Sequence, residues 1–172
     1  VKLRVTGRGA NKNEVVDEVN NQVKLIKNRI ADHVFGDNKD ELSKIVGDLL
    51  LSQNATLSVA ESLTGGALGK EITSVSGASS YFLGGVLSYD PAVKIKELGV
   101  EASAIEKYDV VSKEVATQMA IGVLAKFNST YSIATTGLAG PDGGTEDIPV
   151  GTVFVAVASS NGVVCEKFNF GG

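Results

Sequence analysis

The chain has 172 residues and a formal net charge of −4, with one histidine (His33), one cysteine (Cys165) and no tryptophan. One histidine and one cysteine cannot supply the three or four ligands of a Cys/His zinc site, and they rule out a disulfide framework. The acidic balance and the lack of a Lys/Arg run argue against a nucleic-acid-binding protein, and no apolar run is long enough for a membrane span. We therefore expect a cytoplasmic protein that binds neither nucleic acid nor membrane and needs no metal or cofactor.

The first 39 residues predict only part of a domain. Alternating apolar and polar residues over 1–5 predict a strand, and apolar residues at helical spacing predict a helix capped by Asn13. Residues 33–35 predict a second strand. Because this β-α-β piece is too short to bury a core of its own, we place a domain boundary near residue 39 and expect residues 1–39 to be the end of an upstream domain.

Residues 40–172 alternate predicted helices and strands. The elements are a helix capped by Asp40, a strand at 56–60, a helix to about Val75, a strand at 85–89, a helix over 90–98, a helix capped by Ser112, a strand at 131–136, and a hairpin of strands at 151–158 and 163–170. This order predicts a layered α/β/α fold with a mixed sheet. Ligands of such sheets bind where loops leave the carboxyl ends of strands, so we expect the site at the loops after residues 60, 89 and 136.

The first of these loops contains the hexapeptide ESLTGG at residues 61–66. Polar side chains stand there ahead of two glycines at a predicted helix start, where free amides and the positive end of the helix dipole favour a phosphate or a carboxylate. The same residues also suit a purely structural helix cap. Their spacing alone does not decide between the two interpretations.

A serine-rich turn, GASS at residues 77–80, precedes Tyr89 and Lys94. A serine nucleophile needs a base, and with histidine nearly absent that base would be a lysine or a tyrosine. Tyr89 at a strand end and Lys94 one turn into the next helix could converge on the turn, with burial lowering the pKa of the lysine. An ordinary surface turn beside a solvated lysine explains the same pattern, and the pattern alone favours that simpler interpretation.

The loop after residue 136 is rich in glycine, with the sequence GLAGPDGG at residues 137–144. Its G-x-x-G-x-x-G spacing differs from the G-x-G-x-x-G of dinucleotide-binding loops. Loops with so restricted a backbone path more often have a ligand than not, so we expect this loop to contribute to the site.

These motifs, with residues 79–94 and the pentapeptide PVGTV at 149–153, resemble the C-terminal domain of the CinA (competence-damage-inducible) family. The resemblance covers about residues 40–172. It implies a nicotinamide mononucleotide (NMN) deamidase, a hydrolase that converts NMN and water into nicotinic acid mononucleotide and ammonia in NAD metabolism. Residues 1–39 resemble the end of the KH-like middle domain of the family, with a molybdopterin-binding-like domain upstream.

The resemblance also implies roles for individual residues. Ser79 would be the nucleophile, and Tyr89 and Lys94 would activate it. The residues expected to bind the substrate are Glu61, Ser62, Thr64, Gly65, Gly66, Thr136, Gly137 and Asp142. The phosphate of NMN would lie at the helix start formed by Gly65 and Gly66, and the protein would be a homodimer without metal or cofactor.

Members of the family continue past the last strand with an arginine-containing segment and a C-terminal helix, whereas this chain ends at Gly171 and Gly172. We therefore expect a truncated chain that lacks the last helix of the domain. Two other functions remain open: a nucleotide-binding module that has lost its chemistry, and an assembly domain of a multidomain CinA protein whose ADP-ribose pyrophosphatase activity lies upstream.

Overall fold

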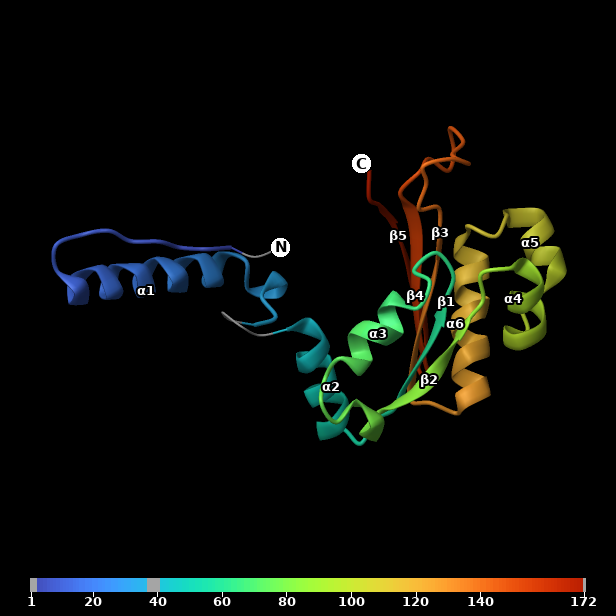
Figure 1. Cartoon of the computed structure of the whole chain (residues 1–172), viewed down its shortest axis with the longest axis horizontal. Helices are drawn as coiled ribbons and strands as arrows, with labels where there is room; N and C mark the ends of the chain where they lie inside the picture. Colours follow the sequence, from blue (N-terminus) through green and yellow to red (C-terminus); the bar gives the residue numbers. More distant parts are fainter. Residues whose placement is uncertain (1–2, 37–40, 172) are drawn as a thin grey trace. The chain divides into compact units, whose positions relative to one another are not determined.

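The computed structural model describes residues 3–36 and 41–171. The chain divides into two compact units, Val1–Ile45 and Val46–Gly172. The first unit contains one long helix, and the second contains a five-stranded sheet (Figure 1). No helix of the described residues is both long and apolar enough to cross a membrane.

The first unit contains α1 (Lys12–Arg29) and a 3₁₀ helix, η1 (Ala31–His33). The side chain of Asn11 accepts a hydrogen bond from the Asn13 N–H, so α1 is capped two residues before the predicted cap. The two predicted strands are not found: residues 3–5 and 33–35 form none, and residues 1 and 2 lie outside the described part of the chain. Alternation alone is insufficient, because a strand also needs a neighbour that pairs with its backbone N–H and C=O groups.

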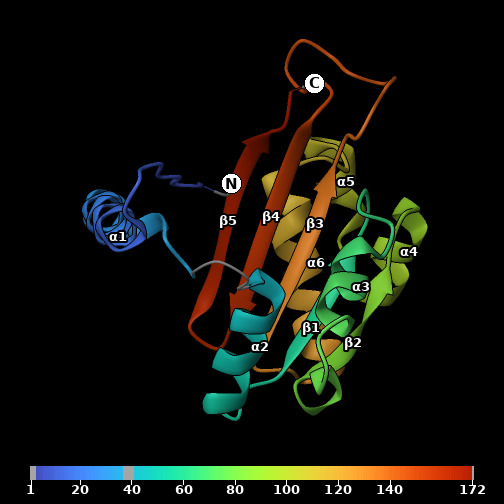
Figure 2. The ribbon, with the colours of Figure 1, turned by 60° about the vertical axis from the view of Figure 1, so that its left-hand side comes forward.

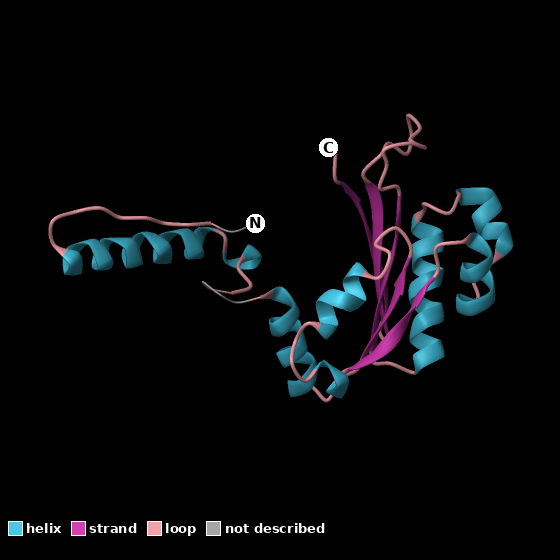
Figure 3. Cartoon of the chain, in the orientation of Figure 1, coloured by secondary structure: helices cyan, strands magenta, loops and turns pink. Residues whose placement is uncertain are grey.

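The second unit is built on a mixed sheet (Figure 3). Its strands are β1 (Leu57–Glu61), β2 (Phe82–Leu87), β3 (Tyr131–Gly137), β4 (Thr152–Ser159) and β5 (Gly162–Asn169), in the spatial order β2-β1-β3-β4-β5. β1 is parallel to both β2 and β3, whereas the β3–β4 and β4–β5 pairs are antiparallel. The predicted mixed sheet with a terminal hairpin is therefore confirmed.

Helices cover both faces of this sheet, which confirms the predicted α/β/α layers (Figure 2). On one face α6 (Lys113–Phe127) packs across the strands, and α4 (Pro91–Leu98) and α5 (Ala102–Tyr108) pack against α6. On the other face lie α3 (Ala67–Thr73) and the part of α2 (Leu42–Ser52) from Val46 onward. A second 3₁₀ helix, η2 (Ala78–Ser80), precedes β2.

Two helix starts differ from the sequence-based expectation. The Asp40 cap expected for α2 lies outside the described residues. α5 is not predicted at all, because it has seven residues, buries only Ala104 and follows Glu101, whose side chain makes no capping hydrogen bond. So short a helix carries neither an apolar stripe nor a cap signal.

Small side chains on the sheet let α6 pack closely. Ala60, Ala134 and Ala156 are fully buried beneath α6, together with Met119 and Val123 of that helix. Successive strand residues point to opposite faces, so the neighbours of Ala60, including Glu61, point to the side that carries α3.

Candidate active site

The carboxyl ends of the parallel strands β1, β2 and β3 meet at one edge of the sheet (Figure 2). Ser62 directly follows β1, Ser88 follows β2, and Thr135 is near the end of β3. Backbone hydrogen bonds join the three segments: the Ser62 N–H donates to the Thr135 carbonyl (3.1 Å), and the Ser88 N–H donates to the Glu61 carbonyl (2.8 Å). This edge is where ligands bind in parallel α/β sheets.

The side chain of Lys94 reaches this edge from α4. Asp90 caps α4, accepting a hydrogen bond from the Ala92 N–H at 2.7 Å, and Pro91 fills the first helical turn, so the predicted start of this helix is confirmed. Lys94 is only 1% exposed. Its Nζ donates to the Ser62 Oγ (3.1 Å) and to the carbonyls of Ser88 and Tyr89 (3.2 Å to Tyr89).

Burial lowers the pKa of Lys94 because it penalises the charged ammonium, and the nearby Asp90 carboxylate opposes this shift only in part. A neutral lysine has two N–H groups and one lone pair. The carbonyls of Ser88 and Tyr89 are suited to accept from the two N–H groups, which leaves the lone pair facing the Ser62 hydroxyl. The arrangement therefore suits a serine and its general base.

Ser62 lies on a tightly held turn between β1 and α3. The Ser62 carbonyl accepts from the Gly65 N–H at 3.1 Å, and the hydroxyls of Thr64 and Thr135 are hydrogen-bonded at 2.9 Å. Gly65 and Gly66 have φ values of 58° and 97°, in the left-handed region that favours glycine. The two glycines of the motif thus serve the backbone path of this turn.

Glu61 occupies the N-terminus of α3. Its buried carboxylate accepts hydrogen bonds from the N–H groups of Gly66 (3.0 Å), Leu68 (3.0 Å) and Gly69 (2.8 Å). The predicted binding of a substrate phosphate at the Gly65–Gly66 helix start is therefore not supported, because a side chain of the protein already satisfies these donors.

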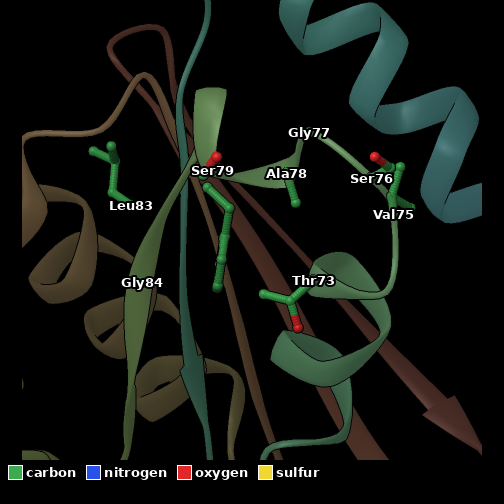
Figure 4. A pocket seen from close by; sticks show the side chains of 9 residues that line it. Thr73, Val75, Ser76, Gly77, Ala78, Ser79, Leu83 and Gly84 are labelled. Carbon is green, nitrogen blue, oxygen red and sulfur yellow. The ribbon is translucent and has the colours of Figure 1, made fainter.

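The structure does not bring Ser79 together with Tyr89 and Lys94. Ser79 is an exposed residue of η2, before β2 begins, whereas Lys94 meets Ser62 beyond the end of β2. The six residues of β2 separate these two ends by about 20 Å. Ser79 instead lines a surface pocket with residues that include Thr73, Ser76 and Leu83 (Figure 4).

Other predicted site residues are placed differently from expectation. Tyr89 contributes its carbonyl, and its side chain is 79% exposed. Thr136 is buried on the opposite face of the sheet, where its hydroxyl donates to the Val110 carbonyl, so Thr135 takes the place expected for it. Adjacent strand residues point to opposite faces, and this alternation could have identified Thr135 from the sequence.

Gly137 and Asp142 do not reach the Ser62–Lys94 pair through any hydrogen bond of the described residues. A Cβ on Gly137 would lie 2.6 Å from the Thr152 carbonyl oxygen, so this glycine allows β3 and β4 to approach closely. Asp142 is exposed in the loop that projects beyond the end of β3 (Figure 2). Ser88 is a site residue that the sequence analysis missed, because the strand predicted at 85–89 in fact ends at Leu87 and leaves Ser88 just beyond it.

The described residues contain no group of three or more His, Cys, Asp or Glu side chains that could hold a metal ion. The polar groups around Ser62 are one amine, hydroxyls and backbone amides and carbonyls. Such a set can transfer a proton between a hydroxyl and an amine.

Comparison with known proteins supplies relatives for the whole chain. It is 40% identical over 173 residues to a "Putative competence-damage inducible protein" from Halothermothrix orenii, covering 100% of this chain and 42% of the relative. It is 45% identical over 172 residues to a "CinA-like protein" from Flavobacterium psychrophilum, covering 99% of this chain and 41% of the relative. The chain thus spans about two fifths of the length of these curated relatives.

Solved structures and a family model agree with these relatives. The crystal structure of "competence/damage inducible protein CihA" from Agrobacterium tumefaciens has a TM-score of 0.75 at 32% identity, covering 80% of this chain and 84% of that one. A CinA superfamily protein from Escherichia coli has a TM-score of 0.75 at 30% identity, covering 81% and 83%. The model of the CinA C-terminal domain matches residues 39–172. The chain therefore belongs to the CinA family, and residues 39–172 are its C-terminal domain.

Proposed function

We propose that this chain is an amidase that hydrolyses NMN to nicotinic acid mononucleotide and ammonia, with Ser62 as nucleophile and Lys94 as general base. The observation that carries the proposal is the buried contact between the Lys94 Nζ and the Ser62 Oγ, 3.1 Å apart. The motifs that resemble the CinA C-terminal domain suggest the substrate. In this proposal Ser62 replaces Ser79, because Lys94 contacts Ser62 whereas Ser79 lies at the other end of β2.

The reaction would proceed in two stages. The Ser62 Oγ bonds to the carboxamide carbon while its proton passes to the neutral Lys94 amine. The tetrahedral intermediate collapses, the C–N bond breaks, and the leaving nitrogen takes the proton from Lys94 and departs as ammonia. Water then attacks the acyl-serine ester, Lys94 accepts a proton from that water and returns it to the Ser62 Oγ, and nicotinic acid mononucleotide leaves.

The oxyanion of each tetrahedral intermediate needs hydrogen-bond donors. Most amides of the Ser62 turn donate within the protein: those of Ser62, Gly65, Gly66 and Ala67 each have an acceptor. The amides of Leu63 and Thr64 have no acceptor in the described part of the chain and directly follow the nucleophile. We assign them the role of oxyanion donors.

Two exposed side chains at the same edge suit the flat pyridine ring of the substrate. Leu87 is 57% exposed and Tyr89 is 79% exposed, and both belong to the segment that supplies the carbonyl partners of Lys94. Burying such side chains against an aromatic ring is favourable. We therefore assign the ring to the surface formed by Leu87 and Tyr89.

The experiment that tests this function measures ammonia release from NMN by the wild-type chain, by Ser62→Ala and by Ser79→Ala as the matched serine control. We expect Ser62→Ala to lower kcat by roughly 10⁴-fold or more, as for other serine nucleophiles. Ser79→Ala should keep the wild-type rate. Equal rates for Ser62→Ala and the wild type would refute the role of Ser62 as nucleophile. If NMN raises the thermal stability of the wild-type chain but no ammonia is released, the domain is instead a binding module.

A further inference from the structure

The residue before the proposed nucleophile has an unusual set of contacts. Glu61 is 2% exposed, and its two carboxylate oxygens accept three backbone hydrogen bonds, all from the start of α3. The remaining amide at this helix start, that of Ala67, donates to the Thr64 carbonyl at 3.0 Å. The N-terminus of α3 is therefore saturated by groups of the protein itself.

These bonds close a loop around Ser62. Glu61 is the last residue of β1, Gly66 precedes α3, and the carboxylate joins them across the turn that contains Ser62. The other hydrogen bonds of this turn are single ones, within the turn itself and to Thr135, Ser88 and Lys94. Carboxylate–amide hydrogen bonds are stronger than neutral ones, and a negative charge at a helix N-terminus is favourable. The carboxylate is thus the strongest restraint on the turn.

We propose that Glu61 is a positioning residue for the reaction: its carboxylate holds α3 against the end of β1 and so sets the Ser62 hydroxyl against the Lys94 amine. The inference rests on the function proposed above. It also assigns the phosphate of the substrate to a place other than the α3 N-terminus, because the donors that would hold it there are already used by Glu61.

The test removes the carboxylate and then supplies it in solution. Glu61→Ala leaves a space beside three amides that formate, a one-carbon carboxylate, can fill. We expect this variant to lose about 100-fold in kcat, because small displacements of a nucleophile are costly, while KM stays near the wild-type value. Formate should restore most of the lost rate in a saturable way, and the pH dependence of the restored rate should match that of the wild type, since Lys94 is unchanged.

Two further variants make the result specific. Glu61→Gln should also lower kcat, but formate should not rescue it, because the amide side chain still fills the space. Glu101→Ala is the matched control: Glu101 is the residue before another seven-residue helix, α5, but its side chain makes no capping hydrogen bond. It should keep the wild-type rate with and without formate. If Glu61→Ala does not fold, the loss of kcat at unchanged KM in Glu61→Gln carries the test.

The outcomes separate the two proposals. A wild-type rate in Glu61→Ala, or a folded Glu61→Ala whose lost rate formate does not restore, overturns the positioning role and leaves the amidase proposal standing. A wild-type chain that releases no ammonia from NMN overturns both.

Discussion

Lys94 has the two properties that a general base at neutral pH needs. It is buried, which lowers the pKa of the amine, and three oxygens hold its Nζ in one place. In the proposed reaction, Lys94 is the member of the Ser62–Lys94 pair whose protonation state sets the rate. Its titration should therefore be visible both in the kinetics and in the stability of the fold.

The first consequence is a pH dependence of NMN hydrolysis. We expect kcat/KM to rise with pH as Lys94 loses its proton, with the midpoint of this limb below the ordinary lysine pKa of about 10.4. The measurement is a pH–rate profile of the wild type beside Lys96→Met, which changes an exposed lysine of the same helix and should leave the profile unchanged. A midpoint at or above the ordinary value would contradict the role of Lys94.

The second consequence concerns stability. In the unfolded chain Lys94 has its ordinary pKa, so between the lowered folded value and the ordinary one the unfolded state binds more protons. The free energy of unfolding should therefore rise with pH across this range. Lys94→Met removes the buried amine, so the stability of this variant relative to the wild type should be highest at pH values below the lowered pKa and should fall as pH rises. Urea unfolding of both proteins at several pH values measures this difference in the free energy of unfolding. A difference that stays constant with pH would refute the lowered pKa of Lys94.

At the scale of elements, the position of α4 depends on one close helix contact. A Cβ on Gly122, in the middle of α6, would lie 1.8 Å from the Leu98 carbonyl oxygen at the end of α4. Glycine inside a helix is unfavourable by about 1 kcal/mol relative to alanine. The close approach of α4, which carries Lys94, explains why glycine stands there.

Gly122→Ala should consequently destabilise the protein although alanine is the better helix former. We expect a loss of about 1–3 kcal/mol in the free energy of unfolding, the usual cost of an overpacked contact, and a fall in kcat as α4 shifts. Urea unfolding measures the first effect and ammonia release the second. Ile121→Ala, at the exposed neighbouring position, is the control and should change stability by less than about 0.5 kcal/mol. A stabilised Gly122→Ala would refute the close contact.

At the scale of the whole molecule, we expect the backbone amides of the two units to differ in their protection against hydrogen exchange. α1 has no buried residue, whereas all five residues of β1 are buried and α6 buries five residues. Local opening is easiest where few apolar groups are buried. In hydrogen exchange of the 172-residue chain, the amides of α1 should exchange much faster than those of α6, a helix of comparable length. Equal protection of α1 and α6 would contradict this expectation.

The element types of the second unit could be read from local patterns. Asp90 with Pro91, and Ser112, are caps that act within a few residues, and both cap the helices they predict. The alternation of strands and helices likewise led to the correct layers. The prediction failed for α5, which has no such local signal. It also failed at residues 3–5, where the strand pattern has no neighbouring strand to pair with.

The candidate site was only partly predictable for a related reason. The motif at residues 61–66 and Lys94 were recognised, but their partnership was not, because Ser62 and Lys94 are 32 positions apart and meet only when β1 and β2 pair. Ser79 has the same chemistry and a shorter separation from Lys94. However, Ser79 lies at the start of β2, whereas Lys94 contacts Ser62 beyond the end of that strand. The number of residues between two positions does not reveal that a strand separates them in space.

By itself, the sequence determined the α/β class, the caps of α4 and α6, the family and the sheet edge of the candidate site, because these depend on periodicity, local hydrogen bonds and short motifs. Only the tertiary structure decided which serine meets Lys94, which of two adjacent threonines faces the site, and that Glu61 takes the helix start expected to hold a phosphate. These choices depend on strand direction, on the face to which a side chain points, and on burial, which the packed sheet alone specifies.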